Sequence, residues 1–392
     1  MDFKDIDKLA EYRQQAREWV ERHVNPDWAE RQRVSGSYHT PELHVLLAEQ
    51  GWLGAGWPAE YGGTDNDPDL AAALFEEIDA AGLHLDGWIT TVMICRTILH
   101  TGTEEQKRAI VGGALAGEVI IVLGYTEPDS GSDVAAAKTK AERDGDEWLI
   151  NGQKMFTSTA HMASHVFMLT RSNTEVAKHK GLTTFLVPLD GPGVEIRAIH
   201  TLGGQRTNAT FYSDVRVPDS ARIGPVDGGW GVMHVALVFE RSGGSGRRSG
   251  PTLAERVAQW ARQARRDDGT RVYDDATVKE RLARIAIEAE VSRLLGMRTA
   301  WVAASGALPG TEGSAAKLFS SESAQRQHWD LLDILGAEAV LRREAGDAPL
   351  GAAVDEAFRR GVVGTIYGGS TEIMREIVAE RVLGLPRVRA RS

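Results

Sequence analysis

Cysteine is nearly absent from the 392-residue sequence, which contains only Cys95. A single cysteine cannot form an internal disulfide, and it cannot supply the cysteine clusters of zinc or iron–sulfur sites. The sequence also lacks an apolar run of the roughly 18 residues that a membrane span requires. Its first residues lack the apolar segment of a signal peptide. We therefore expect a chain without a disulfide or a membrane anchor, located in the reducing cytoplasm.

An excess of basic residues is also absent, because the formal net charge is −10. Nucleic acid is bound through a basic face, so this charge argues against nucleic acid as a main partner. The histidines show no metal-ligand spacing with carboxylates, and the G-x-S-x-G elbow of many serine hydrolases is missing. The remaining composition, 42% hydrophobic and 26% charged, is typical of a globular protein. The length predicts two or three domains.

Hydrophobic spacing divides the chain into three parts. Residues 1–120 have the spacing of amphipathic helices. Residues 121–228 contain short β-branched and aromatic runs that are separated by turn pairs such as Asn-Gly and Pro-Asp. From residue 229 to residue 392 the helical spacing returns in long segments with short connections. We predict an α+β multidomain fold with an N-terminal helical domain (1–120), a central β-barrel (121–228) and a C-terminal four-helix bundle (229–392).

Two motifs of the central part suggest a bound ligand. The first, GYTEPDSGSDVAAAK, follows the apolar run VIIVL and offers backbone N–H groups and the hydroxyls of Thr126, Ser130 and Ser132 from one tight loop. Such a loop can bind phosphate or the polar edge of a ring, although the same residues are equally compatible with an acid-rich turn. The second motif, NGQKMFTS, begins 25 residues after Thr126.

Together these motifs resemble the acyl-CoA dehydrogenase family, whose pattern is close to TEPxAGSD and NGxKxxIT at these places. The resemblance covers nearly the whole chain, because GWLGAGWPAEYGG, GTEEQK, DVRVP, DGGWGV and IYGGSTEIMREIVAERVLGLP also match in order. It implies FAD as cofactor, an acyl-CoA thioester as substrate and oxidation between the α and β carbons. It further implies an electron-transferring flavoprotein as the electron acceptor.

The resemblance also implies which residues hold FAD. Tyr125 and Thr126 meet the edge of the flavin ring, largely through backbone N–H groups and the threonine hydroxyl. Ser132 meets the FAD phosphates. Phe156 takes the place of the family's usual tryptophan against the flavin, and Ser158 takes the place of the threonine that faces flavin N5.

The chemistry needs a carboxylate that removes the α proton and donors for the developing enolate oxygen. Many family members carry this glutamate directly after the tyrosine of the motif IYGGS, where this chain has Gly368. Members that resemble the isovaleryl and long-chain enzymes carry it earlier, before an arginine, and this chain has Glu240 followed by Arg241 there. The resemblance thus implies Glu240 as the base. The N–H of Gly368 and a ribityl hydroxyl of FAD are then the donors to the thioester carbonyl.

The position of Glu240 also bears on the acyl group. In the family this placement often accompanies branched, long or ring-bearing acyl groups. The ending ERVLGLPR resembles actinobacterial members, some of which act on steroid-derived thioesters. By position alone, however, Glu240 is also compatible with a solvated charge near a helix end.

Two segments depart from the family pattern, in which a neighbouring subunit completes the FAD site with Arg-x-x-Phe-Gly and Gln-x-x-Gly-Gly. The nearest matches here have Asp268 in place of phenylalanine and Asp333 in place of glutamine. These aspartates add negative charge where a pyrophosphate lies. Arg265 is a candidate to offset that charge, although residues 265–274 are also compatible with a solvated turn.

Several assemblies and activities therefore remain open. The chain can form a homodimer or homotetramer with a complete FAD site, or a heteromer with a paralogue that supplies half of the site. In the second case it is a subunit with little activity alone. Because one fold hosts several flavin chemistries, an acyl-CoA oxidase and a flavin monooxygenase are further alternatives.

Overall fold

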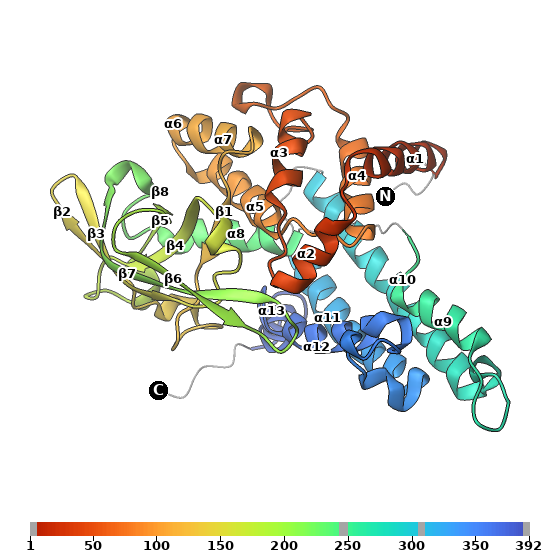
Figure 1. Ribbon diagram of the computed structural model, residues 1–392. Coiled ribbons are helices and arrows are strands. Elements are labelled where there is room, and N and C mark those ends of the chain that lie inside the picture. Colours follow the sequence, from red (N-terminus) through yellow and green to blue (C-terminus); the bar gives the residue numbers. More distant parts are fainter. Residues whose placement is uncertain (1–5, 243–249, 305–309, 387–392) are drawn as a thin grey trace. The chain divides into compact units, whose positions relative to one another are not determined.

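The protein is described here by a computed structural model of residues 6–242, 250–304 and 310–386 (Figure 1). Its internal contacts define two compact units. The N-terminal unit comprises residues 2–201 and 205–243, and the C-terminal unit comprises residues 202–204 and 244–392. The predicted order of helical, β and helical segments is confirmed.

The N-terminal unit begins with helices whose ends are fixed by local polar contacts. The Asp67 side chain caps α4 by accepting hydrogen bonds from the backbone N–H groups of Asp69 and Leu70. Thr103 and Gln106 form a reciprocal capping box at the start of α6, which satisfies backbone N–H groups at that helix end. A π-helical turn, Lys107–Val111, joins α6 to α7. The helices are α1 Ile6–His23, α2 Asp27–Ser35, α3 Pro41–Glu49, α4 Pro68–Ala80, α5 Asp86–Thr101, α6 Glu104–Gln106 and α7 Gly112–Leu115.

One eight-stranded sheet follows, in the order β6-β7-β3-β2-β4-β5-β8, with β1 paired to β4. The β1 strand runs parallel to β4, with Ile121 opposite His165. The register of β3 against β7 shifts at Gly152, where a Cβ atom would lie 2.6 Å from the Thr139 hydroxyl. The strands are β1 Ile121–Gly124, β2 Lys140–Asp144, β3 Glu147–Lys154, β4 His165–Arg171, β5 Leu182–Pro188, β6 Val194–His200, β7 Arg206–Pro218 and β8 Arg222–Ile223.

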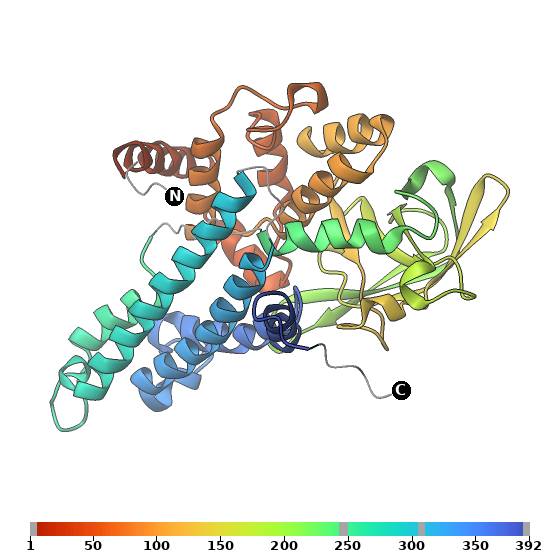
Figure 2. The same cartoon turned by 180° about the vertical axis from the view of Figure 1, so that it is seen from behind.

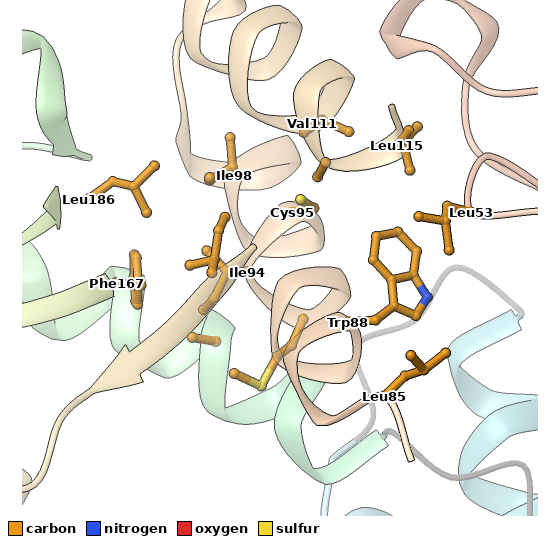
Figure 3. Packing of buried hydrophobic residues seen from close by; sticks show 14 of the residues in the cluster. Leu53, Leu85, Trp88, Ile94, Cys95, Ile98, Val111, Leu115, Phe167 and Leu186 are labelled. Atoms are coloured by element: carbon orange, nitrogen blue, oxygen red, sulfur yellow. The ribbon is translucent and has the colours of Figure 1, made fainter. Parts of the chain in front are cut away.

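Helix α8, Gly229–Ser242, completes the N-terminal unit and packs against α5, β4 and β5 (Figure 2). Helices and sheet share one hydrophobic core. Trp88, Ile94 and Ile98 of α5 belong to the same buried cluster as Phe167 of β4 and Leu186 of β5 (Figure 3). Because burial of each such side chain stabilises the fold by roughly 1.5–3 kcal/mol, this shared core fixes β1 and α8 relative to each other.

The C-terminal unit is helical, as predicted. Its helices are α9 Leu253–Gln263, α10 Ala276–Ala304, α11 Glu312–Leu335, α12 Ala353–Gly361 and α13 Thr371–Arg381. The long helices α10 and α11 pack against each other, and α11 also contacts α12 and α13. Buried side chains such as Val257, Ile285 and Leu331 form its core. Within the described ranges of the chain, no helix combines the length and the apolar character that a membrane span needs.

Candidate active site

The loop that follows β1 is a tightly closed turn, which we call the TEP loop (residues 125–133). The backbone N–H of Glu127 donates to the Ser130 carbonyl at 2.9 Å, and the N–H of Ser130 donates back to the Glu127 carbonyl at 3.2 Å. Thr126 is half-buried, whereas Ser132 is exposed. The loop thus presents the Ser132 hydroxyl on its outer side, whereas Ser130 and Glu127 are buried.

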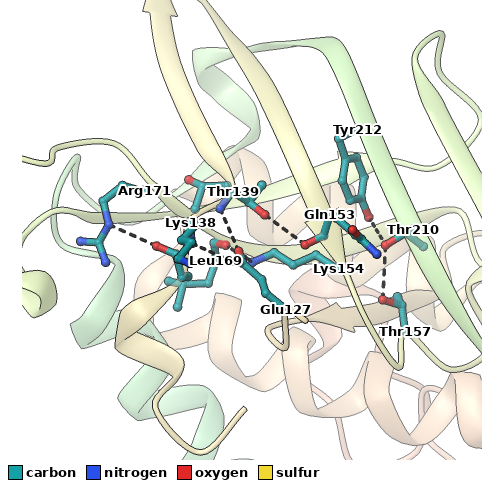
Figure 4. A network of polar contacts seen from close by, with 12 residues as sticks. Glu127, Lys138, Thr139, Gln153, Lys154, Thr157, Leu169, Arg171, Thr210 and Tyr212 are labelled. Carbon is teal, nitrogen blue, oxygen red and sulfur yellow. Dashed lines mark hydrogen bonds and ion pairs between the residues drawn. The ribbon is translucent and has the colours of Figure 1, made fainter. Parts of the chain in front are cut away.

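A buried ion pair anchors this loop to the sheet. Lys154 is fully buried, and its Nζ lies 2.8 Å from Glu127 Oε1 and donates to the Leu169 carbonyl at 2.6 Å (Figure 4). The Glu127 carboxylate also accepts the backbone N–H groups of Lys138 at 2.7 Å and Thr139 at 2.9 Å. Every oxygen of this carboxylate is therefore hydrogen-bonded, which is the condition under which a buried charge is tolerated.

The protonation of the pair follows from these contacts. Burial opposes the ionisation of Glu127, but Lys154 and the backbone donors hold the pKa of its carboxyl below the ordinary value. Burial lowers the pKa of Lys154 to about 8, despite the attraction of Glu127. Both groups are therefore charged at neutral pH.

The outer carboxylates of the TEP loop are also paired. Asp129 lies 2.9 Å from Lys138, and Asp133 lies 2.6 Å from Lys178. These pairs are exposed, and each one offsets a negative charge that an approaching phosphate would otherwise meet. The loop is therefore electrostatically compatible with an anionic ligand.

The second motif continues from β3 into an exposed aromatic residue. Phe156 has a positive φ of 57°, which is uncommon for a residue other than glycine, and its side chain is 59% exposed. The backbone is fixed on both sides, because the N–H of Met155 donates to the Thr126 carbonyl and the N–H of Thr157 donates to the Asn208 carbonyl, each at 2.9 Å. An apolar ring is thus held in solvent beside the TEP loop.

Hydroxyl groups accompany this ring. Ser158 is exposed, and its Oγ lies 3.0 Å from the Thr207 hydroxyl. An exposed aromatic face with hydroxyls nearby suits a planar heterocycle that has polar edges. Phe156, Ser158, Thr126 and Ser132 therefore fit the flavin that the resemblance implies.

Glu240 lies in the last turn of α8 and is half-buried. Tyr125, the first residue of the TEP loop, is almost completely buried, and its ring packs edge-on against Phe167 with centroids 6.0 Å apart. Burial and, secondly, the Glu240 carboxylate raise the pKa of Tyr125 well above its ordinary value. The last turn of α8 and the start of the TEP loop also border the same hydrophobic core, because Tyr125 and Phe239 belong to one cluster. The side chain of Arg241 lies outside the described residues.

Gly368 precedes α13 in the C-terminal unit. Gly368 and Gly369 have φ values of 64° and 91°, and a Cβ atom on Gly369 would lie 2.4 Å from the Met374 side chain. Ser370 then caps α13 by accepting the N–H of Ile373. The left-handed backbone favours glycine at both positions.

The two segments that depart from the family pattern satisfy their polar groups within the C-terminal unit. Arg265 donates to the Gly269 carbonyl at 2.8 Å and so stabilises the turn in which it lies. Asp268 accepts the Thr270 hydroxyl at 2.6 Å. Asp333 forms an ion pair with Arg281 at 2.7 Å.

Sequence reasoning missed two features of the site. It did not predict the Glu127–Lys154 pair, although a lysine at an inward-facing position of β3 was a possible signal. It assigned Tyr125 to the ring edge through its backbone and gave no role to its side chain.

In the part of the chain that the structure describes, no group of three or more potential metal ligands occurs.

Comparison with known families accounts for almost the entire chain. The N-terminal domain model of acyl-CoA dehydrogenases matches residues 7–118, the middle domain model matches residues 122–215 and the C-terminal domain model matches residues 227–383. Among curated proteins, acyl-CoA dehydrogenase FadE26 of Mycobacterium tuberculosis is 34% identical over 90% of this chain and 91% of its own length.

Solved structures give the same result. The Tcur3481-Tcur3483 steroid ACAD superposes with a TM-score of 0.86 and 35% identity, covering 99% of this chain and 100% of that chain. The ChsE4-ChsE5 complex from Mycobacterium tuberculosis superposes with a TM-score of 0.84 and 32% identity, covering 99% of this chain and 100% of that one. The ChsE4-ChsE5 structure is a complex.

Proposed function

Since the chain belongs to the acyl-CoA dehydrogenase family of FAD-dependent flavoproteins, we propose that it oxidises an acyl-CoA thioester to the enoyl-CoA with Glu240 as the base. The observation that carries this proposal is the position of Glu240, which is half-buried in the last turn of α8, a helix that shares one hydrophobic core with Tyr125, the first residue of the TEP loop. A carboxylate near the flavin-binding loop is what removal of an α proton beside the flavin requires.

FAD, when bound, supplies the acceptor for the β hydride. The roles of the protein residues follow from their chemistry. Glu240 removes the α proton, and the N–H of Gly368 stabilises the charge that develops on the thioester oxygen. Phe156 covers an apolar ring face, Thr126 and Ser158 offer hydroxyls to polar edges, and Ser132 meets the phosphates.

We further propose that the acyl group is branched or ring-bearing and that a different chain completes the FAD site. Two solved relatives support this assembly, one a steroid ACAD and the other the ChsE4-ChsE5 complex. Asp268 and Asp333 support it too, because both are engaged within their own unit at positions where the family contacts a neighbour's cofactor. The electrons then pass to an electron-transferring flavoprotein. The location of the protein in the cytoplasm remains a prediction from the sequence.

The base is tested with Glu240→Gln in a flavin-loaded preparation. We expect this variant to retain FAD and to lose turnover by at least about a thousandfold, since the amide cannot accept the proton. Glu142→Gln, at an exposed position on β2, is the matched control and should remain fully active. Near wild-type turnover of Glu240→Gln contradicts the assignment. Release of hydrogen peroxide identifies an oxidase instead.

The assembly is tested by counting FAD per polypeptide after the chain is purified alone. We expect clearly less than one flavin per chain, with one full site recovered when the partner is co-expressed. One flavin per chain in a homo-oligomer contradicts the heteromer and leaves the dehydrogenase intact.

A further inference from the structure

Two half-buried histidines follow β3 in the sequence, and their hydrogen bonds differ in reach. His165 Nδ1 lies 3.0 Å from the hydroxyl of Ser164, its own neighbour. His161 Nε2 lies 2.8 Å from the hydroxyl of Ser37, which is 124 residues distant, in the connection between α2 and α3. The His161 bond therefore joins the helical part of the N-terminal unit to the segment that follows the motif NGQKMFTS.

His161 ends a segment with an unusual backbone, which we call the strained segment (residues 156–161). Phe156 and Thr159 have φ values of 57° and 63°, in a left-handed region that residues other than glycine rarely adopt. Such conformations persist only where the surrounding structure fixes them, and they concentrate at functional sites. Because the Phe156 ring is exposed, its own packing contributes little to this conformation. Contacts elsewhere in the strained segment must therefore hold it.

Two sets of contacts hold the strained segment downstream of Phe156. The N–H of Thr157 donates to the Asn208 carbonyl, and Asn208 Nδ2 donates to the Thr157 carbonyl, each at 2.9 Å. Asn208 is completely buried in the sheet, so this first anchor is rigid. The second anchor is the bond between His161 and Ser37, and it lies beyond both left-handed residues.

The tautomer of His161 follows from the groups that face it. Burial and, secondly, the Arg206 charge lower the pKa of His161 to about 4, so the ring is neutral at neutral pH. Arg206 Nε donates to Asn208 Oδ1 at 3.2 Å, which leaves Asn208 Nδ2 to face His161 Nδ1 in a longer contact of 3.4 Å. Nδ1 therefore faces a donor and acts as the acceptor, and Nε2 carries the proton. His161 is thus the donor in its bond to the Ser37 hydroxyl.

We propose that His161 is a positioning residue that holds Phe156 and Ser158 in their ligand-facing conformation, by bonding the downstream end of the strained segment to Ser37. This inference rests on the proposed flavin site, in which Phe156 covers the ring and Ser158 meets a polar edge. His161 acts through the backbone of the strained segment. Fixing a binding segment before the ligand arrives reduces the entropy that is lost on binding.

The positioning role is tested first in the ligand-free chain, by ¹⁹F nuclear magnetic resonance of protein labelled with 4-fluorophenylalanine. The chain has nine phenylalanines, and Phe156→Tyr assigns the Phe156 signal by its loss. We expect His161→Leu to shift or broaden this signal. His165→Leu is the matched control, because it removes a histidine–serine bond that does not reach Ser37, and it should leave the signal unchanged. An unchanged Phe156 signal in His161→Leu overturns the proposal.

Two milder variants separate positioning from a general loss of stability. Ser37→Ala removes the same hydrogen bond with little change in packing, so it should alter the Phe156 signal while Tm falls by no more than about 4 °C. His161→Gln keeps a side-chain N–H group that can reach Ser37, and it should restore the signal toward that of the wild type. If neither variant behaves in this way, the effect of His161→Leu comes from packing alone and the proposal is overturned.

FAD affinity tests the consequence for the site. In a preparation with a complete FAD site, we expect the Kd for FAD to rise about tenfold in His161→Leu, because the strained segment must then be ordered on binding. His165→Leu should bind FAD as the wild type does. A Phe156 signal that changes in His161→Leu without any loss of FAD affinity contradicts the flavin site on which the inference rests. The failure of the anchor and the failure of the flavin site are therefore distinguishable.

Discussion

The two regions that the family uses to bind FAD differ in where this chain keeps its charges. In the N-terminal unit, Glu127 and Lys154 are buried beneath the TEP loop and bond to each other and to the backbone. In the C-terminal unit, Asp268 and Asp333 are exposed and bond to neighbours within that unit. A buried charge tolerates no loss of its partner, whereas an exposed pair contributes little. The first region is therefore constrained by folding, and the second is free to diverge once another chain supplies its function.

The largest expected effect is that of Lys154→Met. This change leaves Glu127 buried without its cation, and we expect the free energy of unfolding to fall by about 3–5 kcal/mol. Disorder of the TEP loop should lower FAD affinity as well. Denaturant unfolding and FAD titration measure the two effects.

Lys138→Met is the matched control, because Lys138 forms an exposed pair with Asp129. Its expected cost is about 0–1 kcal/mol. Equal costs for the two variants would contradict the distinction between buried and exposed charges.

Acid should destabilise the N-terminal unit through two buried histidines. Burial lowers the pKa of His39 to about 3 and that of His44 to about 4. Below the ordinary pKa of 6.5 the unfolded chain takes up protons that the folded unit does not, so stability falls as the pH falls. At pH 4 we expect a loss on the order of 3 kcal/mol for each histidine.

His44→Leu tests this origin of acid sensitivity. Unfolding curves between pH 7 and pH 4 should show a shallower decline for the variant than for the wild type. His200→Leu, at an exposed position at the end of β6, should follow the wild-type decline. If the stability of His44→Leu declined with pH in parallel with that of the wild type, the explanation would be wrong.

The smallest expected effect on stability belongs to the double variant Asp268→Phe/Asp333→Gln, which restores the family residues. Only exposed contacts are lost, so the free energy of unfolding should change by about 1 kcal/mol or less. If the aspartates are what prevents a complete homomeric FAD site, FAD per polypeptide should rise in the chain purified alone. A stable variant with unchanged FAD content would show that further positions prevent it.

Much of the fold was predictable because it depends on local signals. Turn pairs and β-branched runs defined the strands, and helical spacing defined the two helical parts of the chain. The Glu127–Lys154 pair was not predictable, because it depends on the alignment of β3 with the loop after β1, which involves residues far apart in the sequence. The Tyr125 side chain was missed for a similar reason, since only the packing of α8 shows which charge acts on it.

The site itself was predictable in part. The sequence identified the motifs, and the structure adds which of their side chains face solvent, as Phe156 and Ser132 do. The offsetting of the Asp268 and Asp333 charges by Arg265 at a cofactor remains a prediction from the sequence. The hydrogen bond from Arg265 to Gly269 lies within the turn that the sequence offered as the alternative for residues 265–274.

The left-handed backbone at Gly368 has an evolutionary consequence. Returning the base to the position that many relatives use needs a glutamate at a residue whose φ is 64°, a conformation that costs a side-chain-bearing residue roughly 1–2 kcal/mol. Such a substitution would also place a second carboxylate in the protein while Glu240 remains. Moving the base from position 240 to position 368 is therefore difficult to achieve in evolution. A single codon change would first give a variant with a strained backbone and two carboxylates.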